Sequence, residues 1–332
     1  MVFKICLVGC GGMSNYGHGP ACVKYAASNP DVELSACCDI IEEKAAQFSK
    51  DMGFPRYYAD IADMLHAEKP DAVCLICPPE LTCKLSCRIL ELGFPLIMEK
   101  PPGMTVEEID RMIAAADASG APTQVSFNRR YMPIVKSMKE LLDRELPPER
   151  VQHVRYELSR AQRADADFST TAIHAIDTAR FLARSDYRSV RFRYREFPEI
   201  GTTTANIFMD CVFESGATGS VDFCPVSGLG FETAVVYAHD HTYFLSLPTF
   251  NEYDPTGSVR HFEVGELKLR LTTPDLCDSD ERWAMTGFYD ENACFFDDLR
   301  AGKRPEGDLR SARQSVELMQ YLRERRTVYE KD

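Results

Sequence analysis

The sequence predicts an α/β domain with a doubly wound parallel sheet, followed by an α+β domain with a mainly antiparallel open sheet and flanking helices. Three observations predict this. Apolar strand-like segments alternate with helical segments over the first third of the chain, and a glycine-rich stretch follows the first strand. After residue 127, strand-like segments follow one another with turn residues between them. The expected domains are therefore 1–126 and 127–332.

The elements of the first domain come in strict alternation. Its strands, each bounded by Gly, Pro or Asp, are expected at 3–9, 32–39, 71–77, 94–100 and 122–127. Its helices are expected at 20–28, 41–53, 61–68, 80–93 and 105–120. Thr105 with Glu108 forms a capping-box pattern, and Gly93 and Gly120 follow helices as C-caps.

The second domain is expected to contain helices and a run of consecutive strands. The strands are expected at 151–158, 190–197, 204–214, 217–224, 231–239, 242–247 and 267–273. The helices are expected at 131–144, 169–183, 287–302 and 309–322. The last helix has an apolar stripe of Leu309, Ala312, Val316, Met319 and Leu322.

Composition excludes several functional classes. The net charge of −13 argues against binding to nucleic acid or to an anionic membrane. No stretch approaches a membrane span, and the first apolar run is too short for a signal sequence, so we expect a cytoplasmic protein. The thirteen cysteines lie in apolar strand-like runs, and the Cys74-x-x-Cys77 pair lacks zinc-site partners, so no metal is expected.

The segment GCGGMSNYGHGP at 9–20 resembles a dinucleotide fingerprint whose third glycine is Ser14. Gly9 ends the first strand, and Gly11 would let a pyrophosphate approach the backbone of this Rossmann-type domain. We expect the following helix to start late, with Pro20 in its first turn, so that Ser14 lies in an enlarged loop. A turn without ligand, or a methyltransferase using adenosylmethionine, fits the same pattern.

Asp39 ends the second strand, where a carboxylate can accept hydrogen bonds from both ribose hydroxyls of a nucleotide. It would repel a 2′-phosphate, and the following Ile40 and Ile41 offer no cation. The sequence therefore favours NAD over NADP.

Two further segments contain residues suited to proton transfer. Lys100 ends the fourth strand in LIMEKPPG, where a desolvated lysine could act as general acid/base; a surface pair with Glu99 is the structural alternative. In STTAIHAIDTARFLA, Thr170, His174 and Asp177 share one helical face, apart from the core stripe, although a lone helical histidine also serves structure.

Together these motifs resemble the Gfo/Idh/MocA oxidoreductases, with GCGGM, ICPPELT, EKPPGMT, SFNRRYMP, IHAIDTARFL and GFYDENACFFDDLRAGKRP in the family's order. The resemblance implies a nicotinamide-dependent dehydrogenase of sugars or cyclitols, forming homodimers or homotetramers through its antiparallel sheet. It assigns catalysis to Lys100 and His174 and substrate binding to Asp177. Cofactor contacts would come from Gly9, Gly11, Gly12, Met13, Asp39, Pro78, Glu99 and Lys100.

The chain also departs from the family. Thr170 stands where inositol-dehydrogenase-like members carry an Asp, and a hydroxyl orients an imidazole less strongly. Arg130 and Arg163 would favour a substrate carboxylate or phosphate, or else pair with the many acids of this chain. The prediction is interconversion of a secondary alcohol and a ketone on a sugar, cyclitol, sugar acid or sugar phosphate. Transient oxidation with tightly held NAD and a non-catalytic nucleotide sensor are the alternatives.

Overall fold

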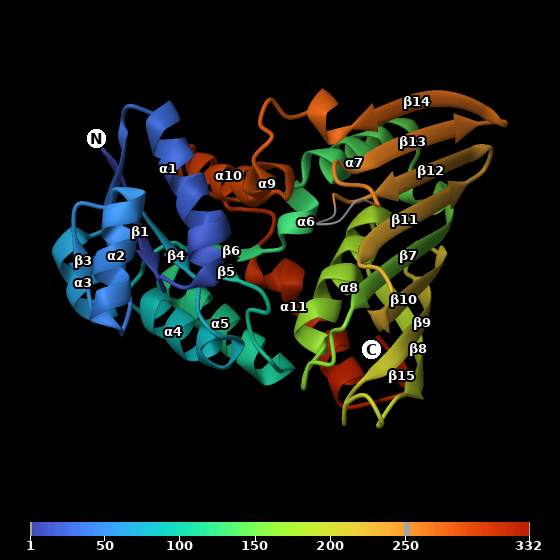
Figure 1. Ribbon diagram of the computed structural model, residues 1–332, viewed down its shortest axis with the longest axis horizontal. Coiled ribbons are helices and arrows are strands. Elements are labelled where there is room, and N and C mark those ends of the chain that lie inside the picture. The colour runs from blue at the N-terminus through green and yellow to red at the C-terminus, as the bar shows by residue number, and fades with distance from the viewer. Residues whose placement is uncertain (1, 249–252, 332) are drawn as a thin grey trace. The chain divides into compact units, whose positions relative to one another are not determined.

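The computed structural model describes residues 2–248 and 253–331, and the chain divides into two compact units, each with its own sheet (Figure 1). The first unit comprises Met1–Asn128 and Glu281–Val316, and the second comprises Arg129–Asp280 and Glu317–Asp332. The expected boundary followed residue 126, and the first stretch of the first unit ends at Asn128. Residues 281–316, which we assigned to the second domain, instead belong to the first unit, because Phe295 and Phe296 lie in its hydrophobic core.

The first unit contains a parallel sheet whose strand order is β3-β2-β1-β4-β5-β6, the classic order of a doubly wound nucleotide-binding fold. Its strands are β1 (Phe3–Val8), β2 (Val32–Cys38), β3 (Tyr57–Tyr58), β4 (Ala72–Leu75), β5 (Leu96–Glu99) and β6 (Thr123–Ser126). Five of these strands were predicted. The two-residue β3 was not, because it is too short to show a periodic pattern.

The predicted helices of this unit are present as α1 (Gly19–Ser28), α2 (Glu42–Met52), α3 (Ile61–Glu68), α4 (Pro79–Glu91) and α5 (Val106–Ser119). Thr105 caps α5 by accepting the Glu108 N–H, and Gly120 ends it in the left-handed conformation, as expected. The short α9 (Arg282–Met285) and α10 (Phe288–Arg300) complete the unit, together with the first half of α11 (Leu309–Arg323). All five residues of the predicted α11 stripe are buried.

The second unit is built on a nine-stranded sheet with the order β14-β13-β12-β11-β7-β10-β9-β8-β15, which Figure 1 shows from top to bottom. All neighbours are antiparallel except β7 and β10. The strands are β7 (Val151–Ala161), β8 (Tyr187–Glu196), β9 (Ala205–Phe213), β10 (Thr218–Ser227), β11 (Phe231–Ala238), β12 (His241–Ser246), β13 (Ser258–Glu263), β14 (Glu266–Thr272) and β15 (Val328–Glu330). The sequence did not reveal β13 or β15.

Helices α7 (Pro133–Glu145) and α8 (Ser169–Ala183) lie along one face of this sheet (Figure 1). The short α6 (Asn128–Tyr131) joins the two units, and 3₁₀ turns occur at Pro148–Arg150 and Thr273–Asp275. Across the described residues, none of the helices combines the length and the apolar character needed to cross a membrane.

Candidate active site

The glycine loop lies at the carboxyl end of β1, next to the switch point between β1 and β4. Gly9 has φ +90°, and a Cβ there would fall 1.8 Å from the Ile76 carbonyl oxygen, so close packing requires glycine. Gly11 and Gly12 are different, because a Cβ on either would meet nothing within 4 Å. Protein packing does not explain these two glycines, and the open space beside them, next to the exposed Met13, fits a bound pyrophosphate.

The helix after the loop differs from our expectation. Residues 12–28 are continuously helical, so the helix does not start late at Pro20. A π-helical segment, Ser14–His18, precedes α1, and the Gly19 N–H donates to the Ser14 carbonyl five residues back. This wider turn takes up the extra residues that the sequence suggested were loop. Ser14 is fully buried and its hydroxyl donates to the Gly9 carbonyl, so it packs where we expected an enlarged loop.

Asp39 lies directly after β2 and faces the glycine loop. Its Oδ2 accepts the Cys10 N–H at 2.8 Å, and its Oδ1 accepts the Ile41 N–H at 2.9 Å. Each carboxylate oxygen has a further lone pair for a ligand hydroxyl. Ile40 is 89% exposed, and no basic side chain stands beside the carboxylate in residues 38–43. The loop, the open glycines and this carboxylate together fit the pyrophosphate and ribose of NAD.

Lys100 follows β5 at the same sheet edge and is partly buried. Its backbone N–H donates to Glu99 Oε2 at 3.0 Å, while Glu99 Oε1 lies 3.0 Å from His18 Nε2. Burial alone would raise the pKa of Glu99, but the His18 hydrogen bond and the nearby Lys100 charge hold it below its usual range. Glu99 is therefore a buried anion beside the lysine, and not the exposed half of a surface pair.

Two buried residues that the sequence did not single out, His18 and Asn292, support Glu99. The Asn292 side-chain amide lies 3.1 Å from His18 Nδ1 and also donates to the Phe288 carbonyl. This contact fixes the histidine that in turn holds Glu99. The pair is 274 residues apart in the chain, so no local pattern could reveal it. Pro78, the remaining predicted cofactor residue, is exposed just before α4.

Helix α8 places His174 and Asp177 in the second unit, both buried, at 7% and 1% exposure. Arg130 forms a bidentate pair with Asp177, at 2.7 Å from Nε to Oδ2 and 2.6 Å from Nη2 to Oδ1. Arg130 and Asp177, both predicted to bind substrate, are thus bound to each other. Thr170 Oγ1 lies 3.4 Å from the Asp167 carbonyl, on the first turn of the helix.

Two other arginines, Arg129 and Arg160, bind one carboxylate. This carboxylate belongs to Glu232, which lies at the start of β11 and is 6% exposed. It accepts hydrogen bonds from Arg129 Nη2 at 2.6 Å, from the Tyr156 hydroxyl at 2.7 Å and from Arg160. The cluster carries two positive charges against one negative charge. Nothing in the sequence around Glu232 marks it as the partner of residues 72 and 103 positions away.

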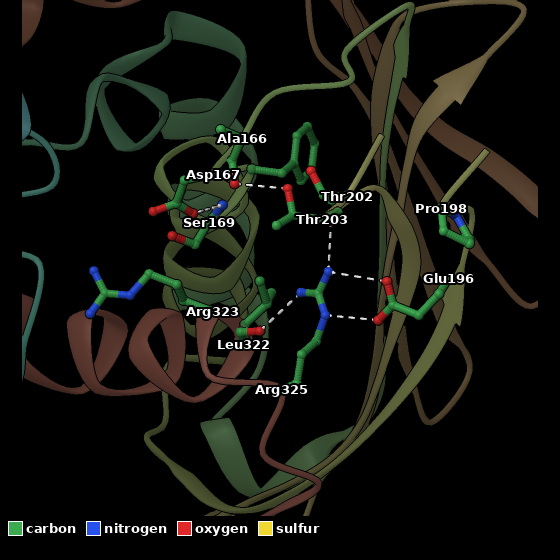
Figure 2. A pocket seen from close by; sticks show the side chains of 11 residues that line it. Ala166, Asp167, Ser169, Glu196, Pro198, Thr202, Thr203, Leu322, Arg323 and Arg325 are labelled. Carbon is green, nitrogen blue, oxygen red and sulfur yellow. Dashed lines mark hydrogen bonds and ion pairs between the residues drawn. The ribbon is translucent and has the colours of Figure 1, made fainter. Parts of the chain in front are cut away.

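Arg163 lies apart from these clusters and forms an exposed pair with Asp165, 2.6 Å away. Beyond it, a cavity of about 360 Å³ opens beside the first turn of α8, and Figure 2 shows Asp167 and Ser169 on one side and the Arg325–Glu196 pair on the other. None of the predicted site residues lines this cavity.

Lys100 belongs to the first unit, and His174, Asp177, Thr170, Arg130 and Arg163 belong to the second.

Comparison with known proteins agrees with this reading of the first unit. Residues 3–127 match the Gfo/Idh/MocA family model, described as an oxidoreductase family with an NAD-binding Rossmann fold. The chain is 22% identical to scyllo-inositol 2-dehydrogenase (NAD(+)) of Bacillus subtilis, over 84% of this chain and 82% of that protein. It is also 22% identical to the uncharacterized oxidoreductase YrbE of the same organism, over 62% of this chain but only 64% of YrbE.

A solved structure of an oxidoreductase domain protein from Kribbella flavida superimposes with a TM-score of 0.83, at 17% identity, over 99% of both chains. At this identity the likeness shows the fold alone. It confirms the predicted combination of a doubly wound parallel sheet with a mainly antiparallel second sheet.

Proposed function

We propose that the chain, whose residues 3–127 match the Gfo/Idh/MocA family of oxidoreductases with an NAD-binding Rossmann fold, is an NAD-dependent dehydrogenase interconverting a secondary alcohol and a ketone on a carbohydrate-like substrate. The observation that carries the proposal is Asp39 Oδ2 bound to the glycine-loop amide of Cys10, beside glycines that no packing demands. This arrangement supports the proposal that the loop binds a pyrophosphate and that Asp39 accepts the ribose hydroxyls. The chain's similarity to a named scyllo-inositol dehydrogenase supports a polyol substrate class.

In this proposal, bound NAD would supply the hydride acceptor. Lys100 Nζ would take the hydroxyl proton during oxidation and return it to the ketone oxygen during reduction. The buried Glu99 anion, bound to His18, would fix the backbone at Lys100 and place a negative charge near the Lys100 side chain. His174 would serve as a secondary proton relay or hydroxyl anchor, beside the Arg130–Asp177 pair.

We further propose NAD in preference to NADP, because Asp39 would repel a 2′-phosphate and Ile40 and Ile41 supply no charge to offset it. A cytoplasmic location is consistent with thirteen cysteines that form no disulfide in the described residues. A homodimer or homotetramer through the nine-stranded sheet remains our expectation, supported by the placement of α7 and α8 on one face of that sheet.

The test uses full-length protein, NAD and separate pools of cyclitols, aldoses, uronates and sugar phosphates, with NADH formation as the readout. We expect one pool to be active and Lys100→Met to lower its kcat by about 10²–10⁴-fold, the usual contribution of general acid–base catalysis. Lys84→Met, an exposed lysine on α4, is the matched control and should retain activity. If every pool is silent while NADH still binds, net oxidation is refuted in favour of bound-cofactor chemistry or sensing.

A further inference from the structure

Three metal-ligating side chains converge in the second unit, away from the residues discussed above. Glu145 is the last residue of α7, His241 is the first residue of β12, and His261 lies in β13. His241 Nδ1 is 3.0 Å from His261 Nε2, and His261 Nδ1 is 3.5 Å from Glu145 Oε2. One ligand atom from each of the three residues lies within 4.8 Å of the other two.

Tyr243 supports the cluster on one side, and a cavity opens on the other. His261 is 4% exposed and stacks on Tyr243, its direct cross-strand partner, with ring centroids 4.3 Å apart and planes 8° apart. The Tyr243 hydroxyl donates to Glu145 Oε2 at 2.7 Å, which fixes the carboxylate. Glu145 and His241 are only partly buried, and all three ligands line a cavity of about 450 Å³. An ion from solvent can therefore reach an already ordered set of donors.

We propose that Glu145, His241 and His261 bind one divalent transition-metal ion, for which Zn²⁺ is the probe. Two imidazoles and a carboxylate form a ligand set that borderline cations favour. Tetrahedral Zn²⁺, with bonds near 2.0–2.1 Å, needs ligand atoms about 3.3 Å apart. His261 would give the ion one nitrogen. Its Nε2 lies 3.0 Å from His241 Nδ1, close to that spacing, while Glu145 Oε2 lies 3.5 Å from the other nitrogen, Nδ1. One ligand atom from each residue already lies within 4.8 Å of the other two, so turning the partly buried His241 and Glu145 side chains would bring the three donors to a common ion. Water would complete the coordination.

The charges around the cavity permit a cation. Glu263, Lys268 and Arg144 also line it. Lys268 lies 2.8 Å from Glu266 and 3.8 Å from Glu263. Arg144 lies 3.1 Å from Glu145 Oε1, which leaves Glu145 Oε2 facing His261. Binding would tie the end of α7 to the β12–β13 hairpin. The metal would thus act on the second unit's own structure, and the proposal does not depend on the proposed dehydrogenase activity.

The decisive experiment is calorimetric titration of chelator-treated full-length protein with ZnCl₂, in a Cys294→Ser background that removes the exposed thiol. We expect one equivalent of Zn²⁺ to bind. His241→Gln should raise the Kd by about 100-fold or more, because even loss of a residue that only supports a metal ligand costs up to about 100-fold in metal affinity. His239→Gln is the matched control, because His239 is an exposed histidine two residues away that pairs with Asp240.

Thermal unfolding provides the second readout. Zn²⁺ should raise the Tm of the parent and of His239→Gln, but not of His241→Gln, since only a ligand that binds the folded state stabilises it. His241 is half-exposed, so its variant should fold, and an unchanged Tm without metal verifies this. Absence of binding to the parent protein, or equal affinity in His241→Gln, would overturn the proposal and leave a purely hydrogen-bonded cluster.

Discussion

Replacing Glu232 with Gln should destabilise the second unit far more than loss of an ordinary ion pair. The carboxylate is 6% exposed, and it is the acceptor for two guanidiniums and a phenol. A Gln at this site keeps the shape of the side chain but replaces one carboxylate oxygen with an N–H₂ group, so that hydrogen-bond donors of Gln and Arg face each other. Arg129 and Arg160, whose side chains are only 13% and 21% exposed, would lose their counter-charge.

The expected magnitude follows from the burial. Removing one partner of a buried ion pair costs about 3–5 kcal/mol, because the remaining charge stays uncompensated. For a folding unit of ~150–250 residues, each kcal/mol lowers the Tm by about 2–4 °C, so we expect a decrease of roughly 6–20 °C. Asp210→Asn is the matched control in the same sheet: its pair with Arg193 is exposed at 57% and 66%, and its loss should cost about 0–1 kcal/mol.

The assay is urea unfolding of both variants at two pH values. Burial alone would raise the pKa of Glu232, but the guanidiniums of Arg129 and Arg160 hold it well below its usual range. An unfolded glutamate has a pKa near 4.3, so the stabilisation is present above about pH 4.3 and is lost as the pH falls below it. The gap between wild type and Glu232→Gln should shrink from about pH 6 to about pH 3. Equal free energies of unfolding for Glu232→Gln and Asp210→Asn at pH 6 would refute the reasoning.

Two further predictions concern the glycine loop. Gly9→Ala should lower the free energy of unfolding by several kcal/mol, because the added Cβ would fall 1.8 Å from the Ile76 carbonyl oxygen. Gly12→Ala has open space around the added Cβ, so it should unfold like wild type. In a fluorescence titration Gly12→Ala should nevertheless bind NAD more weakly. Comparable stability of the two variants would contradict this. Asp39→Ala should lower the ratio of NAD to NADP affinity by about tenfold, equivalent to 1.4 kcal/mol, and an unchanged ratio would show that Asp39 does not select the cofactor.

Sequence periodicity predicted most of the fold because it reports local geometry. The β1 and β2 strands, the α5 cap at Thr105 and the buried stripe of α11 are each signalled by residues only a few positions apart along the chain. The position of Asp39 directly after β2 was also predictable, since it depends only on the order of strand, loop, helix and strand.

The partners of the site residues could not be predicted, because they depend on which distant segments the fold brings together. Asn292 reaches His18 only because α10 returns to the first unit, and Glu232 meets Arg129 only through the position of β11. The same holds for His241 and His261, which stand on strands 20 residues apart, one of them unpredicted. The helical start at Gly12 was missed because the π-helical turn accommodates glycines that normally indicate loop.

The central position of β7 has a consequence for how the protein folds. β7 is the first strand of its sheet to be made, yet it lies in the middle, between β10 and β11. Its residue His153 pairs with Thr218, 65 residues later, and Tyr156 bonds Glu232, 76 residues later. During synthesis β7 therefore has both edges unpaired until two further hairpins emerge. Such non-local pairing slows folding and exposes a strand to association, so a newly made chain should depend on chaperones until β11 is complete.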